Sequence, residues 1–116
     1  MALTKIVLSG SSYGAPIQVS ATSIGSGTTI HTASNTMSAG LGDEVVLYAA
    51  NIDSVSHALV LGLGGTSVAY QLDFTIGPNS TQQILPGALL QNSLVIYAAA
   101  DLTNKINIFG YVIRSA

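Results

Sequence analysis

The sequence contains no cysteine and no tryptophan, and it is poor in charge. Without cysteine, the chain can form neither a disulfide bond nor a thiolate metal site. Three basic residues stand against five acidic ones, so the chain cannot build the basic patch of a nucleic-acid-binding protein. Hydrophobic residues make up 48 % of the chain, yet no unbroken apolar run approaches the ~20 residues of a membrane span. The N-terminal sequence MALTKIVLSG also lacks the layout of a signal peptide.

The scarcity of charge has a consequence for the surface. A folded monomer of 11.8 kDa exposes on the order of 5,900 Å². Its charged side chains then supply roughly one charge per 700 Å², which is sparse beside the usual charged fraction of ~25 %. Serine and threonine, 24 residues in all, supply much of the remaining polarity. This composition favours a subunit of a symmetric assembly; a Ser/Thr-coated monomer is the alternative.

The residue types favour strands and turns. Glu occurs once and Lys twice, so strong surface helix formers are scarce, whereas Thr, Val, Ile and Tyr are plentiful and Gly occurs 12 times. Turn signals recur about every 8–12 residues, as in β-sandwich proteins. We therefore predict one domain, residues 1–116, with an all-β fold. It is a β-sandwich of jelly-roll type with eight or nine short antiparallel strands. The predicted strands are Leu3–Ser9, Pro16–Thr22, Thr28–Ala33, Val45–Ala50, Ala58–Leu63, Tyr70–Ile76, Thr81–Leu85, Leu94–Ala100 and Ile106–Arg114.

The central stretch, Asp43–Gly65, holds two strands that are apolar on both faces. We predict that Val45–Ala50 and Ala58–Leu63 form a β-hairpin, joined by the polar segment Asn51–His57. A strand with one face in water alternates apolar and polar residues, and these two strands do not. Something must therefore cover their second face, and a neighbouring subunit is the candidate.

Two glycine-containing motifs invite a catalytic or phosphate-binding interpretation. Gly10–Gly14 matches G-x-S-x-G, but the hydrolase elbow needs a following helix, and Pro16 with an alternating strand follows here. Gly62–Thr66 lacks the Gly-Lys-Ser/Thr of a phosphate loop. We expect turns or a bulge at both places, and no catalytic residue is predicted.

Metal and sugar sites have weak support in the sequence. His31 and His57 could join Asp43, Glu44 or Asp53, but their spacing matches no known metal site. Loop or surface histidines are the simpler expectation, and no metal or cofactor is predicted. The acids Asp53, Asp73 and Asp101 form no dense calcium loop. The five tyrosines (Tyr13, Tyr48, Tyr70, Tyr97 and Tyr111) could stack on sugars, although strand filling or an interface role is the simpler interpretation.

Three runs of the sequence carry a resemblance to a known class of protein. They are His31–Ser34, Gly40–Asn51 and Ile108–Arg114. In these runs and in its composition, the chain resembles small structural proteins of tailed bacteriophages. The nearest sub-type is the capsid decoration, or cement, protein. That resemblance implies a β-sandwich homotrimer, made in the host cytoplasm and bound to the outer capsid surface of the virion. It implies that the trimer clamps neighbouring capsomers of the major capsid protein and binds no nucleic acid or membrane.

Decoration proteins share no catalytic site, so contact residues are predicted from position alone. Terminal arms and polar loops can order on a partner's surface. We therefore expect capsid contact at Met1–Thr4 and in the loop Ser34–Gly42. The alternatives are a tail or fibre-base component of the virion, and a small carbohydrate-binding module that uses Tyr and Asp on a concave face. The predicted capsid contacts are Met1, Ala2, Leu3, Thr4 and Met37, and the predicted subunit-interface residues are Val46, Tyr48, Val60 and Tyr97.

Overall fold

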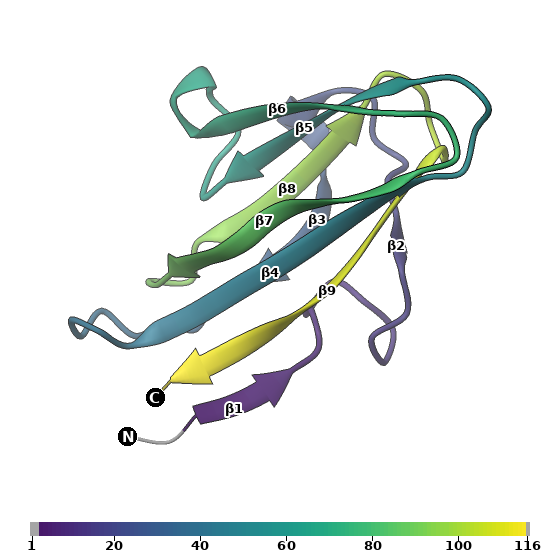
Figure 1. Ribbon diagram of the computed structural model, residues 1–116. Coiled ribbons are helices and arrows are strands. Elements are labelled where there is room, and N and C mark those ends of the chain that lie inside the picture. The colour runs from purple at the N-terminus through teal and green to yellow at the C-terminus, as the bar shows by residue number, and fades with distance from the viewer. Residues whose placement is uncertain (1–2, 116) are drawn as a thin grey trace.

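The computed structural model describes residues 3–115 and is a β-sandwich of two antiparallel sheets (Figure 1). This confirms the predicted all-β sandwich. Two short 3-10 helices, η1 (Ile24–Ser26) and η2 (Val68–Tyr70), interrupt the connections. The strands are β1 (Leu3–Ile6), β2 (Ile17–Gln18), β3 (Thr28–Thr32), β4 (Gly42–Asn51), β5 (His57–Leu63), β6 (Gln71–Ile76), β7 (Thr81–Leu90), β8 (Val95–Ala100) and β9 (Ile106–Ser115).

The strands pair in a nested order. In one sheet, here called the β4 sheet, the order is β1-β9-β4-β7, with β2 also paired to β9; in the other, the β5 sheet, the order is β3-β8-β5-β6. Strand β5 pairs with β6, β4 with β7, β3 with β8 and β2 with β9. The chain is therefore a long antiparallel ribbon, closed at the β5–β6 turn and rolled into two layers. Its dimensions are 45 × 26 × 21 Å.

The predicted hairpin between β4 and β5 is wrong. Strand β4 pairs with β7 and β9, whereas β5 pairs with β6 and β8. The connection 52–56 is thus an arch that crosses from one sheet to the other. Asn51 fixes its base, because the side-chain Nδ2 donates to the carbonyl oxygens of Val55 (2.8 Å) and Ile76 (3.0 Å). The polar residues of an arch and of a hairpin loop are alike, so local sequence could not separate the two.

Two other predicted boundaries also needed correction. Strand β7 does not end at Leu85 but continues through Pro86 and Gly87 to Leu90. Proline is tolerated because β7 is at a sheet edge. The register also shifts there: Val45 pairs with Ala88 and Val46 with Pro86, so that Gly87 between them has no partner residue on β4. Gly87, the skipped residue, has a φ of +134°, which an L side chain rarely adopts. The predicted strand Pro16–Thr22 shortens to β2, and Leu3–Ser9 likewise ends early, at Ile6 of β1.

The core lies between the two sheets and is built from alternate residues of each strand. On β4, Val45, Leu47 and Ala49 are fully buried against β5 and β8 residues such as Leu61 and Ala98. Burying an aliphatic side chain of this size stabilises the fold by about 1.5–3 kcal/mol. Twenty buried apolar residues form this single cluster.

The chain itself covers part of the outer sheet faces. Val46, on the outer face of the β4 sheet, is only 6 % exposed, and Ala99 on β8 is 1 % exposed. Over β5, a Cβ on Gly62 would lie 2.2 Å from the Gly65 carbonyl oxygen and 3.6 Å from Ile24 Cδ1. The loop after β5 and the helix η1 therefore cover strand surface for which the sequence alone suggested a neighbouring subunit.

Candidate functional site

Four segments far apart in the sequence lie at one end of the sandwich, the left end in Figure 1, with the start of β1 and the β5–β6 loop at its opposite corners. The Gln91 side chain donates to the carbonyl oxygens of Ser38 and Leu41, each at 2.6 Å. The Asn92 N–H donates to Thr36 O at 2.9 Å. These bonds hold the loop before β4 to the β7–β8 turn. We call this end the neutral end and define it as residues 3–4, 33–41, 64–70 and 91–94.

The neutral end contains no charged residue in any of its four segments. It nevertheless exposes large apolar side chains, which monomeric proteins normally bury or scatter singly. A surface rich in exposed apolar side chains and poor in charge is typical of a protein–protein contact. The exposed fractions are Leu3 68 %, Met37 73 %, Val68 84 %, Tyr70 47 % and Leu94 38 %, and Leu89 beside them is 52 % exposed.

Two shallow hollows connect three of these segments, 3–4, 33–41 and 91–94. Leu3 and Gly40 line one hollow of about 300 Å³ together with Leu89, Ile113 and the charged Glu44. Gly40 also lines the second, about 390 Å³, with Leu94. The structure thus brings together the N-terminal strand and the loop Ser34–Gly42, which the sequence analysis chose separately as contact segments. Thr4 lies in β1 beside Leu3, Met37 lies in the loop, and Met1 and Ala2 fall outside the described residues.

The four predicted subunit-interface residues lie on two opposite faces. Val46 and Tyr48 are on the outer face of the β4 sheet, where Tyr48 stacks on Phe109 with ring centroids 5.2 Å apart. Val60 and Tyr97 are on the outer face of the β5 sheet, and both are half-buried. The four residues therefore form no single patch, and Val46 itself offers little surface.

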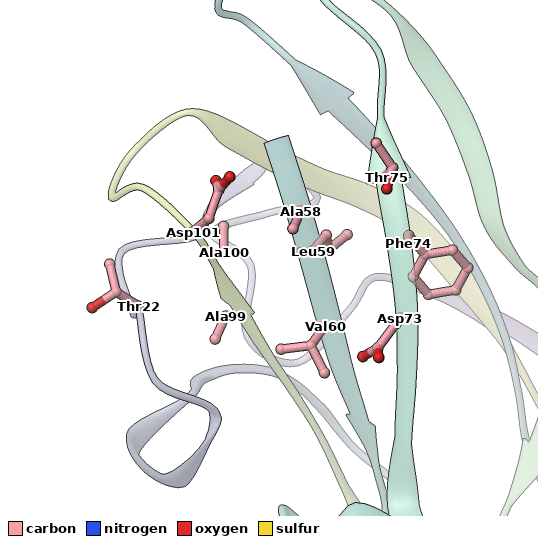
Figure 2. Close-up of a pocket in the computed structure, with 10 residues that line it drawn as sticks. All are labelled: Thr22, Ala58, Leu59, Val60, Asp73, Phe74, Thr75, Ala99, Ala100 and Asp101. Carbon is pink, nitrogen blue, oxygen red and sulfur yellow. The ribbon is translucent and has the colours of Figure 1, made fainter. Parts of the chain in front are cut away.

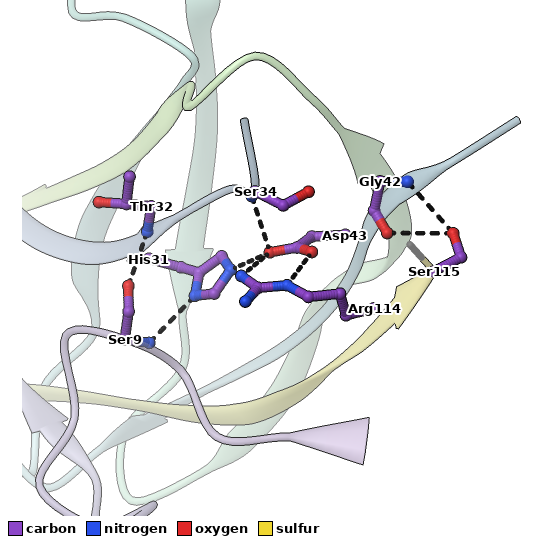
Figure 3. Close-up of polar contacts among 8 residues, drawn as sticks. All are labelled: Ser9, His31, Thr32, Ser34, Gly42, Asp43, Arg114 and Ser115. Atoms are coloured by element: carbon purple, nitrogen blue, oxygen red, sulfur yellow. Dashed lines mark hydrogen bonds and ion pairs between the residues drawn. The ribbon is translucent and has the colours of Figure 1, made fainter. Parts of the chain in front are cut away.

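A buried carboxylate links both sheets near the neutral end (Figure 3). Asp43 of β4 is fully buried and accepts two hydrogen bonds from Arg114 of β9, at 2.7 and 2.8 Å. His31 Nε2 of β3 lies 2.7 Å from the same carboxylate, and the Ser34 N–H donates to it at 3.2 Å. Because His31 Nδ1 accepts from the Ser9 N–H (3.0 Å), the ring proton is on Nε2 and is donated to Asp43.

The charge state of Asp43 follows from these contacts. Burial alone would raise the pKa of Asp43, but the hydrogen bonds and charge of Arg114, with the bond from His31, lower it to about 2. Asp43 in turn raises the pKa of Arg114. The pair is therefore ionised at neutral pH, and the carboxylate is fully satisfied by four donors.

The expectation that both histidines are loop or surface residues is wrong. His31 is completely buried, and His57, at the start of β5, is 5 % exposed. His57 Nδ1 lies 2.7 Å from Asp101 Oδ1, and Nε2 lies 2.8 Å from Asp53 Oδ2. The two carboxylates bind opposite ring nitrogens, so they do not converge on one point. Within residues 3–115, no three His, Asp or Glu side chains are placed to hold a metal ion.

A groove of about 430 Å³ lies on the outer face of the β5 sheet (Figure 2). Its floor consists of small and apolar side chains, among them Ala58, Val60 and Ala99. Asp73 and Asp101 stand at its rims, and the Phe74 ring points to the opposite side of β6 from Asp73. No tyrosine lines this groove, so it lacks the aromatic platform on which a sugar ring would stack.

The two glycine-containing motifs are turns in the structure. The Ser12 carbonyl accepts from the Ala15 N–H at 3.0 Å, and β2 follows rather than a helix. Each histidine ring is held at both nitrogens, as described above, so neither has a nitrogen free to activate Ser12. Gly64 adopts a φ of +92° in the turn after β5, as the turn interpretation of Gly62–Thr66 predicts.

The sequence analysis did not predict the ion-pair partners of Asp43 and His57. Arg114 and Asp43 are 71 residues apart, and His57 and Asp101 are 44 apart. Only the strand pairing of β4 with β9 places the first pair side by side. The available signal was a charged residue near the end of an otherwise apolar strand, as Asp43 is in β4 and Arg114 in β9.

The comparisons with known proteins add no relative: no family model, no curated protein and no solved structure matches the chain. In the part of the chain that the structure describes, no helix is long and apolar enough to span a membrane.

Proposed function

We propose that this protein is a structural virion protein, a capsid decoration or cement protein of a tailed bacteriophage. It binds the outer surface of the phage head by its neutral end and stabilises the shell across capsomer junctions. The observation that carries the proposal is that several exposed apolar side chains and uncharged loops lie at that same end. The resemblance of His31–Ser34, Gly40–Asn51 and Ile108–Arg114 to phage structural proteins supplies the biological class.

The chemistry of the neutral end suits a large protein surface better than a small ligand. Its hollows are shallow, and Leu3, Met37 and Val68 project from separate segments rather than into one cavity. A contact of this kind buries mainly apolar area, and Glu44 at the hollow beside Leu3 is the charged residue next to it. Weak binding by each copy is sufficient, because many copies act on one shell.

The strand pairing supports the finer fold assignment. The nested order, in which β5–β6, β4–β7, β3–β8 and β2–β9 pair in turn, is the arrangement expected of a jelly roll. Jelly-roll domains are common in viral capsids, which agrees with the proposal at the level of the fold. Fold alone does not assign function, so the neutral end remains the main support.

In this proposal the protein assembles as a homotrimer. A ring is closed by head-to-tail contacts, which use two different patches of each subunit. The aromatic surface around Tyr48 and Phe109 and the surface around Val60 and Tyr97 are two such patches.

The capsid-binding step is tested with one variant and a matched control. Met37→Asp places a charge at the neutral end, and Val55→Asp places one in the arch, where Val55 is 56 % exposed. Because a buried unpaired charge is costly, we expect Met37→Asp to weaken co-sedimentation with undecorated phage heads by at least tenfold, roughly 1.4 kcal/mol. Val55→Asp should bind like the wild type. Equal binding by all three proteins would contradict the assignment of the neutral end.

The assembly step is tested by light scattering on the purified protein. A mass near three times 11.8 kDa supports the trimer, and a monomer at all concentrations contradicts it. Heating virions with and without the protein then tests stabilisation. An unchanged temperature of DNA release would count against a cement role.

A tail or fibre-base component is the second candidate. The observation that favours it is that Val46 and Tyr48 lie opposite Val60 and Tyr97 on the sandwich. Patches on opposite faces can stack subunits into an open thread instead of a closed ring. A solution mass that keeps rising with concentration would support this candidate over the trimer.

A further inference from the structure

At the end of the sandwich opposite the neutral end, one histidine connects two separate pieces of chain. His57 begins β5, Asp53 lies in the arch before it, and Asp101 directly follows β8. The His57 side chain is 6 % exposed, Asp53 25 % and Asp101 48 %. The contact with Asp53 is local, whereas the contact with Asp101 joins the arch to the start of the β8–β9 turn, residues 101–105. The end of that turn is held separately by the Ile52 N–H, which donates to Lys105 O at 3.0 Å.

Both contacts form together only when the histidine ring is positively charged. An ionised carboxylate accepts hydrogen bonds and cannot donate them. Both ring nitrogens of His57 face carboxylate oxygens at hydrogen-bonding distance, so both must carry a proton. A neutral ring has one proton, and its bare nitrogen would then face an oxygen lone pair at about 2.7–2.8 Å. Loss of one proton therefore leaves one carboxylate without a donor.

We propose that His57 is a proton-operated latch that holds the β8–β9 turn to the arch and releases it when the ring becomes neutral. The Asp101 contact is the one that opens. Asp101 is the more exposed of the two carboxylates, so water replaces its lost hydrogen bond at lower cost. The proton that remains on Nε2 keeps the local bond to Asp53.

The charges around the latch agree with this geometry. Its hydrogen bond to Asp53 raises the pKa of His57 above the ordinary 6.5; burial opposes this in part, and Asp101 adds to the rise. The bond from His57 lowers the pKa of Asp53 below the ordinary 3.8, and the charge of Lys105 lowers it further. Among residues 3–115, Asp53, Asp101 and Lys105 are thus the charged groups that act on the latch.

The sign of the pH dependence follows directly. A raised histidine pKa stabilises the folded state below pH 6.5, and this contribution is lost as the pH rises through the raised value. The lowered pKa of Asp53 stabilises the folded state above pH 3.8, and this contribution is lost as the pH falls through the lowered value. The latch is therefore closed from about pH 4 to beyond pH 6.5. Opening of the latch also alters the groove on the β5 sheet, because Asp101 forms part of one rim of this groove.

The test follows ring ionisation and turn opening separately in the wild-type protein. Ring-nitrogen NMR shifts give the titration of His57. Amide hydrogen exchange, corrected for the intrinsic pH effect, follows the Asp101 N–H, which donates to Ala58 O, and the Asn104 N–H, which donates to Val19 O. We expect protection of both amides to fall at least tenfold over the His57 titration. Protection of the Gly64 N–H, which donates to Val95 O at the neutral end, should stay constant.

Two variants and one control separate the latch from a general pH effect. Asp101→Ala removes the hydrogen-bond partner of Nδ1 and should leave the turn weakly protected at every pH, and His57→Gln should do the same. Asp73→Ala makes the same change at the other rim of the groove and should keep the wild-type pH response. If His57→Gln fails to fold, the wild-type titration and Asp101→Ala still decide. A His57 titration at or below pH 6.5, or protection at Asp101 that simply follows Gly64, would overturn the proposal.

Discussion

Asp43 shows how a single buried charge is made tolerable in an apolar domain. An isolated carboxylate in a protein interior is very unfavourable, and it is kept only when paired and hydrogen-bonded. Asp43 has both, since Arg114 binds it through two parallel hydrogen bonds and His31 and the Ser34 N–H complete its shell. These donors come from β9, β3 and the loop after β3, so one residue ties the two sheets together.

Removing this charge should destabilise the protein in a pH-dependent way. Asp43→Asn leaves Arg114 without its ion pair, and we expect the free energy of unfolding at pH 7 to fall by about 2–4 kcal/mol. Arg114 is about one-third exposed, which favours the lower part of that range. The pKa of Asp43 is lowered to about 2, so its contribution is present above pH 3.8 and lost as the pH falls.

Urea denaturation at several pH values measures this effect. The matched control is Glu44→Gln, which removes the same charge from the next, exposed residue and should change stability by less than about 0.5 kcal/mol. The gap between the wild type and Asp43→Asn should shrink from pH 5 to pH 2. A gap as large at pH 2 as at pH 7 would show that the carboxylate charge is not its cause.

The strands illustrate which parts of the fold local sequence can specify. The residues of β4, β6 and β9 favour extended structure strongly enough that their positions were predicted within a few residues. Their partners were not, because the pattern of β4 is the same whether it pairs with β5 or with β7 and β9. Pro86 shows the same limit, since proline ends a central strand but not an edge strand.

The candidate site likewise has features that could be predicted from the sequence and features that could not. Leu3 and the loop Ser34–Gly42 were chosen as contact segments from chain position and polarity alone, and their placement at one end depends on the rolled ribbon. The burial of His31 and His57 could not be predicted, because each is stabilised by an aspartate whose position is set by tertiary structure. Isolated polar residues inside apolar strands are the sequence signal for such buried pairs.

Gly62 is the position at which β5 depends most on the absence of a side chain. A Cβ there would lie 2.2 Å from the Gly65 carbonyl oxygen, and a backbone atom cannot rotate away as a side chain can. Gly62→Ala must therefore displace the loop 64–70, and we expect a loss of about 1–3 kcal/mol in the free energy of unfolding. Gly25→Ala in η1 is the control, because its nearest neighbour, Ser23 Oγ, would be 3.8 Å away.

The control should range from no change to a gain of about 1 kcal/mol, since alanine restricts the unfolded chain. Thermal or urea denaturation of the two variants provides the comparison. Equal destabilisation by both would mean that glycine is needed for backbone freedom in general and not for the close approach of the 64–70 loop.

The nested pairing of the whole chain makes a prediction about the order of folding. Strands β5 and β6 are joined by a short loop, so that Gly62 pairs with Gln71 only nine residues later. Strands β2 and β9 pair Ile17 with Ile108, which are 91 residues apart. Closing a longer loop costs more entropy before any contact is gained. Folding should therefore begin at the β5–β6 hairpin, and the ribbon should pair outward from it.

Two conservative variants test this order, because both sites are fully buried isoleucines. Ile76→Val lies in β6 and Ile108→Val in β9, and each should destabilise by about 0.5–1.5 kcal/mol. If the hairpin forms early, Ile76→Val mainly slows folding, with a φ-value of about 0.5 or more. Ile108→Val then mainly speeds unfolding, with a φ-value below about 0.3. Stopped-flow folding and unfolding rates in urea give both values. A φ-value for Ile108→Val equal to or above that for Ile76→Val would mean that β9 pairs first, and that the long-range closure of the sandwich, rather than its local hairpin, organises the fold.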